Sequence, residues 1–193
     1  TQRDFIEYFI ELKEKNHLDN EINLDYDYYI ANPPYNCHEL DFIRNNKTVL
    51  KKTYESVGVN NMYSMFLSSM ISLAKEGALI GVIISDSFLT AKMHAGLRQQ
   101  IIESCSIHQL LLCPSDLFWK QKADVRTCII ILQKGKDYQK NISILNRPDN
   151  TDQLKMFLST KDFISVQFNQ ILLSSKKSSN QFIIDVDSKI LKL

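Results

Sequence analysis

The stretch YYIANPPYNCH, residues 28–38, decides the fold of this chain. Residues 26–31 are rich in aromatic and β-branched residues, which is the composition of a strand buried on both faces of a sheet. The Pro33–Pro34 pair ends that strand, because a proline has no N–H to donate to a neighbouring strand and disfavours helical backbone in the residue before it. The stretch therefore predicts a strand that stops in a rigid turn.

Further strands and helices alternate along the chain around this turn. Short apolar runs predict strands at 78–84, 107–112 and 127–133. Helical spacing of apolar residues predicts helices at 4–14, 62–75 and 97–104. Residues 36–60 are polar and aperiodic, which favours a long loop. The order predicts an α/β fold in which a mostly parallel sheet ends in an antiparallel strand pair and carries helices on both faces.

Composition and charge exclude several classes of protein. The 193 residues are 44% hydrophobic and carry a formal net charge of +1, which is ordinary for a globular domain. This charge identifies no partner, and any contact with nucleic acid would need a local basic patch. No run of about 18 apolar residues and no signal peptide is present, which predicts no membrane span and favours a cytoplasmic protein. Four cysteines without a CxxC pair favour reduced core residues. The adjacent Cys37 and His38 have no second ligand pair, so no metal is expected.

The rigid turn has the chemistry of a binding site. In α/β sheets, ligands bind beyond the carboxyl ends of the strands, where this turn lies. The side-chain oxygen of Asn32 and the main-chain carbonyl of Pro33 form a fixed pair of acceptors, which suits an amino group that donates two hydrogens. Tyr35 offers a flat face on which a ring could stack, worth roughly 1–3 kcal/mol per base. These residues predict a pocket for an amino group attached to a planar ring.

At this point the chain resembles a known family. IANPPY, residues 30–35, looks like motif IV of S-adenosylmethionine-dependent amino methyltransferases, and specifically of the N6-adenine DNA methyltransferases of restriction–modification systems. NMYSMFLSSMISLAKEGALIGVIISDSFL, 61–89, is similar to the next block of that family. LRQQIIES, 97–104, and LLLCPSDLFWKQKADVRTCIIILQKG, 110–135, resemble its final strand pair with an aromatic-bearing loop. The resemblance covers about residues 25–136 and implies the second half of a Rossmann-like methyltransferase fold.

The resemblance implies roles for residues on the target-base side. Asn32 and Pro33, held by Pro34, would accept hydrogen bonds from the adenine N6 amino group. Tyr35 and Phe118 would stack on the flipped base, with Trp119 as the alternative to Phe118. Extruding the base costs a few kcal/mol, which the aromatic wall must offset. The methyl group would pass directly from the sulfonium to the nitrogen, without a covalent enzyme intermediate.

The resemblance implies fewer contacts elsewhere. Phe66 would line the cofactor pocket, while Lys120, Lys122 and Arg126 would contact the DNA backbone. The implied partners are double-stranded DNA and a specificity subunit, a restriction subunit or a fused nuclease, in the cytoplasm of a bacterium or archaeon. Alternatives are a protein-glutamine or RNA-guanine amino methyltransferase, or a catalytically inactive module that binds DNA or a partner.

The chain departs from the family's pattern in one important respect. Residues 1–25 contain no glycine, so motif I, the glycine-containing turn that holds the cofactor, is absent. We therefore expect residues 1–136 to be a partial catalytic domain and 137–193 to be a linker and the start of an extension towards a target-recognition domain. S-adenosylmethionine would be bound by the full-length protein, and weakly or not at all by this chain alone. Within this extension the sequence predicts a strand at 141–145, a helix at 152–158 and a linker or flexible loop at 174–181.

Overall fold

The computed structural model describes residues 4–15, 24–35, 40–59, 61–119, 125–136, 141–175 and 178–184. Its helices are α1 (Phe5–Lys15), α2 (Leu40–Asn45), α3 (Lys47–Thr53), α4 (Met62–Leu73), η2 (Asp86–Leu89), η3 (Lys92–His94), α5 (Ala95–Ser104), α6 (Thr151–Thr160) and α7 (Phe168–Ile171). Its strands are β1 (Tyr28–Ala31), β2 (Leu79–Ser85), β3 (Cys105–Leu112), β4 (Thr127–Lys134), β5 (Asn141–Leu145), β6 (Ile164–Gln167), β7 (Leu172–Ser175) and β8 (Ser178–Phe182). No helix within these ranges is long and apolar enough to cross a membrane.

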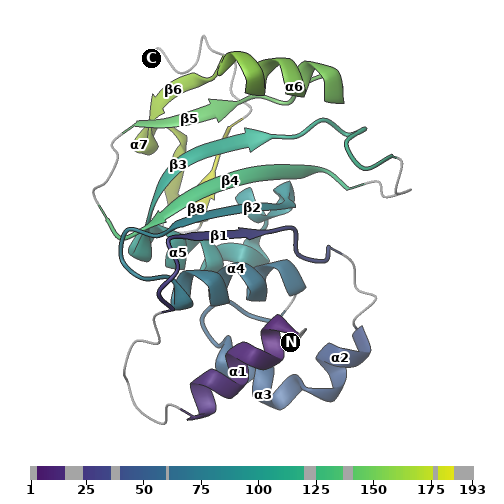
Figure 1. The fold of residues 1–193 in the computed structure, drawn as a ribbon, viewed down its shortest axis with the longest axis vertical. Coiled ribbons are helices and arrows are strands. Elements are labelled where there is room, and N and C mark those ends of the chain that lie inside the picture. Colours follow the sequence, from purple (N-terminus) through teal and green to yellow (C-terminus); the bar gives the residue numbers. More distant parts are fainter. Residues whose placement is uncertain are drawn as a thin grey trace.

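Six of these strands form one twisted sheet in the order β1-β2-β4-β3-β5-β6 (Figure 1). The pairs β1–β2 and β3–β5 are parallel, and β4 lies between β2 and β3, antiparallel to both. Four strands, β1, β2, β3 and β5, therefore run in one direction, while β4 and β6 run in the other. This confirms the predicted α/β sheet and its antiparallel β3–β4 pair.

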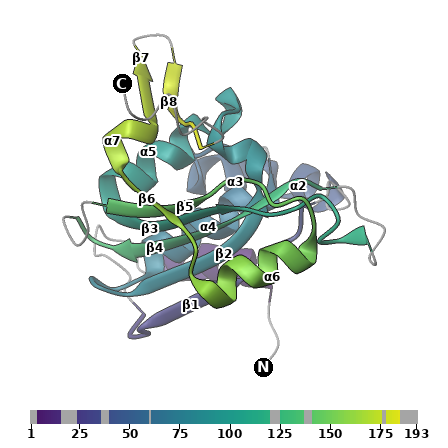
Figure 2. The same ribbon diagram turned by 90° about the horizontal axis from the view of Figure 1, so that it is seen from above.

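Helices cover both faces of the sheet, as predicted. Successive residues of a strand point to opposite faces, so each central strand serves two cores. Ile80 and Ile84 of β2 lie in the main core with apolar residues of α4 and α5. Ile83 of β2 and Ile129 of β4 belong to a second core around Leu154 of α6. Figure 2 shows α6 on the side of the sheet away from α4 and α5.

A second helical layer packs on the far side of α4. Ile6 and Phe9 of α1, Leu50 of α3 and Met65 of α4 form a separate buried cluster between these helices. The prediction of a long loop at 36–60 is wrong over most of its described part, which contains α2 and α3. These helices have 6 and 7 residues, too few for a helical period to emerge from a polar sequence.

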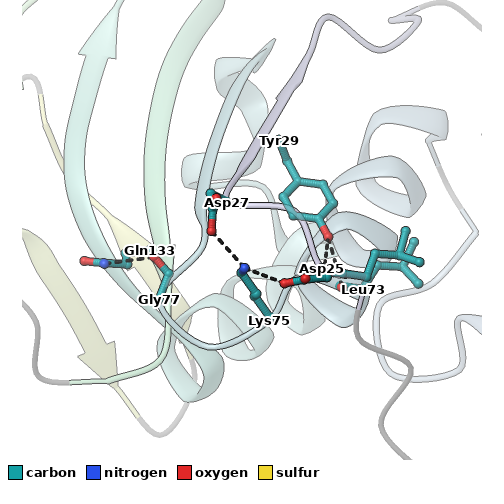
Figure 3. Close-up of polar contacts among 8 residues, drawn as sticks. Asp25, Asp27, Tyr29, Leu73, Lys75, Gly77 and Gln133 are labelled. Atoms are coloured by element: carbon teal, nitrogen blue, oxygen red, sulfur yellow. Dashed lines mark hydrogen bonds and ion pairs between the residues drawn. The ribbon is translucent and has the colours of Figure 1, made fainter.

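Polar contacts fix the start of β1 to the turn between α4 and β2 (Figure 3). Lys75 Nζ lies 2.6 Å from Asp25 Oδ1 and 2.8 Å from Asp27 Oδ1, and the hydrogen bonds from these carboxylates raise the pKa of Lys75. The Tyr29 hydroxyl lies 3.1 Å from the carbonyl oxygen of Leu73, to which it donates. Exposed ion pairs contribute little to stability. The contacts of Lys75 with Asp25 and Asp27 nevertheless help to position the start of β1, and with it the carboxyl end of this short strand.

β1 is an edge strand of the described sheet. Tyr28 and Ile30 are 72% and 89% exposed, whereas Tyr29 and Ala31 pack against the main core. The prediction of a strand buried on both faces is therefore wrong within the described ranges. An apolar composition indicates that a strand can be buried, but another segment of the chain must pack against it to bury it.

Two strands after residue 136, β5 and β6, continue the same sheet, whereas β7 and β8 form a separate one. β5 pairs with β3, and β6 pairs with β5, so the strand and the helix expected at 141–145 and 152–158 are both confirmed. The linker expected at 174–181 is wrong, because β7 and β8 form a hairpin. Phe182 explains the hairpin, since its buried ring meets Phe88 edge to face at 6.2 Å. The division of the chain at residue 136 stays a prediction.

Candidate active site

The carboxyl ends of β1, β2, β3 and β5 meet at one edge of the sheet, at the right of Figure 1. Asn32 follows β1, Asp86 follows β2 and Cys113 follows β3. Arg126 precedes β4, which starts at this edge because it runs the opposite way, and Arg147 lies shortly after β5. The edge therefore gathers residues from five separate parts of the sequence.

The turn after β1 presents its asparagine to solvent. Pro33 is buried, whereas Asn32 and Pro34 are exposed and Tyr35 is half-buried. The buried proline ring anchors the turn and cannot extend the ladder, since it has no N–H. The Asn32 carboxamide is thus held at the rim of the sheet with its side chain accessible.

The Tyr35 hydroxyl ties this turn to β2. It lies 2.7 Å from the carbonyl oxygen of Ile83 and 2.6 Å from Asn32 Oδ1, and it donates its single proton between the two acceptors. Burial raises the pKa of Tyr35 well above its ordinary value, with the thiols of Cys113 and Cys128 adding to the effect. The hydroxyl therefore remains a donor at neutral pH and orients the oxygen of the Asn32 amide.

Tyr35 and Phe118 form an aromatic wall, although they come from segments far apart in the sequence. Phe118 lies between β3 and β4, and its ring centroid is 5.9 Å from that of Tyr35 with an interplanar angle of 56°. Both rings are half-buried, whereas Trp119 is 71% exposed. Of the two aromatic residues predicted for this wall, the structure places Phe118 against Tyr35. The stacking roles of these residues stay predictions.

An ion pair crosses the same edge behind the aromatic wall. Asp86 accepts a short hydrogen bond from the guanidinium of Arg147, which also donates to the carbonyl oxygen of Cys113. Arg126 Nε lies 3.6 Å from Asp86 Oδ2. Neither Asp86 nor Arg147 is predicted from the sequence. For Asp86 the sequence did contain a signal, because this charged residue of SDSF directly follows a buried strand, at the end where α/β sheets place their binding sites.

The other predicted site residues are distributed less closely. Arg126 has a side chain that is 63% exposed and lies at the rim of the site, so its contact with DNA stays a prediction. Lys120 and Lys122 lie outside the described residues. Phe66 of α4 packs on Phe5 of α1 with ring centroids 5.1 Å apart, and its contact with a cofactor also stays a prediction.

A buried polar network leads inward from the end of β2. The His94 ring is 1% exposed; its Nε2 lies 2.7 Å from the Tyr63 hydroxyl and 3.3 Å from Asn61 Nδ2, while Nδ1 lies 3.0 Å from Ser64 Oγ. An amide nitrogen only donates, so Nε2 is the acceptor and Nδ1 carries the proton. The Tyr63 hydroxyl also lies 3.0 Å from Ser87 Oγ, which connects the network to the residues after β2.

Metal ligands are not assembled in the described part of the chain. No group of three or more His, Cys, Asp or Glu side chains could hold an ion there, and Cys37 and His38 lie outside the described residues. Cys105, Cys113 and Cys128 are free and buried, and burial raises the pKa of each thiol. Cys105 of β3 and Cys128 of β4 pack in the main core, and Cys113 packs in the second core directly after β3.

This fold is shared with restriction–modification proteins. The structure is similar to a protein from Vibrio vulnificus YJ016 assigned as the modification subunit of a type I restriction enzyme, with a TM-score of 0.62, 14% identity, and coverage of 92% of this chain and 42% of that one. It is also similar to the ATP-dependent type ISP restriction–modification enzyme LlaBIII bound to DNA, with a TM-score of 0.53, 16% identity, and coverage of 92% and 14%. At these identities the likeness shows the fold alone.

Sequence comparison establishes the family. The chain is 26% identical over 137 residues to the type I restriction enzyme MjaIX methylase subunit of Methanocaldococcus jannaschii, covering 68% of this chain and 24% of that protein. The model of the N-6 DNA methylase family matches residues 7–187. The chain therefore belongs to the N-6 DNA methylase family, which confirms the resemblance predicted from IANPPY. It spans about a quarter of the length of this curated relative.

Proposed function

We propose that this chain supplies the target-base side of an S-adenosylmethionine-dependent methyltransferase that methylates adenine N6 in double-stranded DNA, within a restriction–modification system. The observation that supports this most directly is the placement of Asn32 beside the Tyr35–Phe118 wall at the carboxyl edge of the sheet. An exposed acceptor next to a flat apolar surface fits an amino group on an aromatic ring. Family membership supports the same assignment.

The turn after β1 would act by orienting the amino group. The N6 hydrogens would be donated to Asn32 Oδ1 and to the main-chain carbonyl of Pro33, which directs the nitrogen lone pair towards the methyl group. A carboxamide oxygen has two lone pairs, so Asn32 can accept from the base and still accept from Tyr35. S-adenosylmethionine, when bound, supplies the electrophilic methyl group. The contribution of this chain is orientation and exclusion of water.

The aromatic wall would hold the flipped base. Tyr35 and Phe118 are in contact and tilted, so they form one surface against which a base would stack rather than two plates around it. Stacking is worth roughly 1–3 kcal/mol per base, which is the size needed to offset extrusion of a base at a few kcal/mol. On the cofactor side, Phe66 would contribute only the part of its ring that Phe5 leaves free.

The partners follow from the same assignment. Double-stranded DNA would lie along the rim that carries Arg126, with Lys120 and Lys122 in the same loop as further phosphate contacts. A specificity subunit, a restriction subunit or a fused nuclease would complete the system. The LlaBIII structure, a restriction–modification enzyme bound to DNA, shares the fold of this chain and supports a DNA partner.

The decisive experiment measures methyl transfer by the full-length protein with Asn32→Ala. Unmethylated plasmid DNA and a release-factor protein are each incubated with methyl-labelled S-adenosylmethionine, and the product nucleosides are separated. We expect N6-methyladenine from the wild type and a loss on the order of 100-fold or more in the variant, the size seen when one preorganised hydrogen-bonding group is removed. Asn141→Ala, an exposed asparagine at the start of β5, is the matched control at the opposite edge. Transfer that survives Asn32→Ala, or that labels only the release factor, would overturn the proposal.

A further inference from the structure

The turn that carries Phe118 is held by residues from beyond the catalytic block. It follows β3, and its described part, residues 114–119, closes on itself by backbone hydrogen bonds. Contacts within so short a turn cannot set its direction relative to the sheet. Three attachments to the segment 145–154 do so, at Cys113, Asp116 and Leu117.

The first attachment is a two-point contact between Asp116 and Thr151. Thr151 Oγ1 donates to Asp116 Oδ1 at 2.9 Å, and the Thr151 backbone N–H donates to Asp116 Oδ2 at 3.2 Å. Thr151 is the first residue of α6, where backbone N–H groups lack partners within the helix and the helix dipole favours a negative charge. Asp116 thus satisfies a group that α6 cannot satisfy itself, and both ends of the contact are fixed.

The other two attachments flank the first. Leu117 packs into the apolar cluster that contains Leu145 and Leu154, and Arg147 donates to the carbonyl oxygen of Cys113. The chain is therefore held at Cys113, immediately before the turn, and through the side chains of Asp116 and Leu117 within it. Phe118 is the next residue, and its ring is the one that meets Tyr35.

We propose that Asp116 and Thr151 are positioning residues for the target-base pocket, and that their contact holds Phe118 against Tyr35. The proposal rests on the proposed function, because only there does Phe118 touch a base. Neither Asp116 nor Thr151 touches the substrate. The consequence is that α6, which lies beyond the segment resembling the catalytic motifs, belongs to the same functional unit as the turn after β1.

The order of the turn can be measured without any activity. Trp119 is the only tryptophan in the chain, and it adjoins Phe118, so its fluorescence anisotropy reports motion of the turn. Asp116→Ala removes both hydrogen bonds and Thr151→Val removes one, while Thr151→Ser retains the hydroxyl. Asp152→Ala is the matched control: its carboxylate is 92% exposed, one residue along the same helix, and pairs with Lys155.

We expect the anisotropy of Trp119 to fall in Asp116→Ala and, by a smaller amount, in Thr151→Val. It should stay at the wild-type value in Thr151→Ser and in Asp152→Ala. Circular dichroism confirms that each variant folds, and Thr151→Val provides the test if Asp116→Ala does not fold. An anisotropy unchanged in a folded Asp116→Ala variant, or unchanged in Thr151→Val when Asp116→Ala fails to fold, would overturn the proposal.

The same variants are then assayed for methyl transfer in the full-length protein. Misplacing a group by about 1 Å can cost up to 100-fold in rate, so we expect kcat to fall on the order of tenfold in Asp116→Ala while KM for S-adenosylmethionine is unchanged. Thr151→Ser and Asp152→Ala should retain the wild-type kcat. A lower anisotropy with unchanged kcat would refute the positioning role. A wild type that transfers no methyl group to adenine would refute the proposed function instead, and the anisotropy result would still decide whether the contact orders the turn.

Discussion

Protonation of His94 is expected to destabilise the folded protein as the pH falls below about 6.5. The ring is 1% exposed and both nitrogens are engaged by neutral polar groups. Burial lowers the pKa of His94 from 6.5 to about 4, and the nearby charge of Arg98 contributes to the shift. No carboxylate within this network compensates a positive charge on the imidazole.

The size of the effect follows from the two pKa values. In the unfolded chain His94 binds a proton as the pH falls through 6.5, whereas in the folded protein it remains neutral until about pH 4. The unfolded state therefore binds more protons throughout this window, and stability falls as the pH falls. At about 1.4 kcal/mol per pKa unit, this group is expected to cause a loss of about 2–3 kcal/mol between pH 7 and pH 4.5.

Urea unfolding at several pH values between 7 and 4.5 tests this expectation. His94→Gln keeps one acceptor and one donor but cannot titrate, so its free energy of unfolding should fall by about 2–3 kcal/mol less than that of the wild type over the window. His108→Gln is the matched control, because it removes a histidine from β3 and leaves His94 in place; it should show the full loss. Parallel curves for the wild type and His94→Gln would show that His94 is not the buried neutral group described above.

Two further substitutions test other parts of the fold. In Gly96→Ala the new Cβ would lie 1.7 Å from the carbonyl oxygen of Ser56, so an overpacking cost of about 1–3 kcal/mol should outweigh a gain in helix propensity of about 1 kcal/mol. Urea unfolding should show a net loss of stability that is larger than for Gly81→Ala. A stability equal to or greater than that of the wild type would contradict the packing of α5. Tyr35→Phe removes the hydroxyl that donates to Ile83 but retains the ring, so thermal unfolding should show a loss of about 1 kcal/mol, and no loss would mean that the hydroxyl does not bridge β1 and β2.

The strands and the long helices could be predicted from the sequence because their signals are local. The strands β2, β3 and β4 follow from short apolar runs, although β3 begins two residues before the predicted strand. Helix α4 follows from a helical period over 12 residues. Where the sequence misled, the deciding contact was distant. The polar run at 174–181 contributes residues to β7 and β8, which pair antiparallel. The buried ring of Phe182 at the end of β8 meets Phe88, and nothing within the run itself indicates that contact.

The candidate site divides in the same way. Asn32, the two prolines and Tyr35 form one contiguous motif whose chemistry can be recognised from residue types alone. Asp116 and Arg147 could not be recognised, because each is an ordinary charged residue until the fold gives it a partner in another segment. For Asp86 the only signal was its position directly after a buried strand. The sequence thus predicted the surface that is proposed to meet the base, and missed the residues that are proposed to hold that surface in place.

The position of β4, antiparallel between β2 and β3, explains how Tyr35 and Phe118 come to lie together in the aromatic wall. A parallel successor to β3 would require a crossover that returns the chain to the opposite edge of the sheet. Because β4 runs back between β2 and β3, the connection leaves and re-enters at the carboxyl edge, where Tyr35 also lies. The described residues of this connection, up to Trp119 and from Val125 onward, therefore lie at the same edge as the site. The position of Phe118 within it then depends on what holds the turn, and the parallel strand β5 delivers Arg147 and α6 to that same edge.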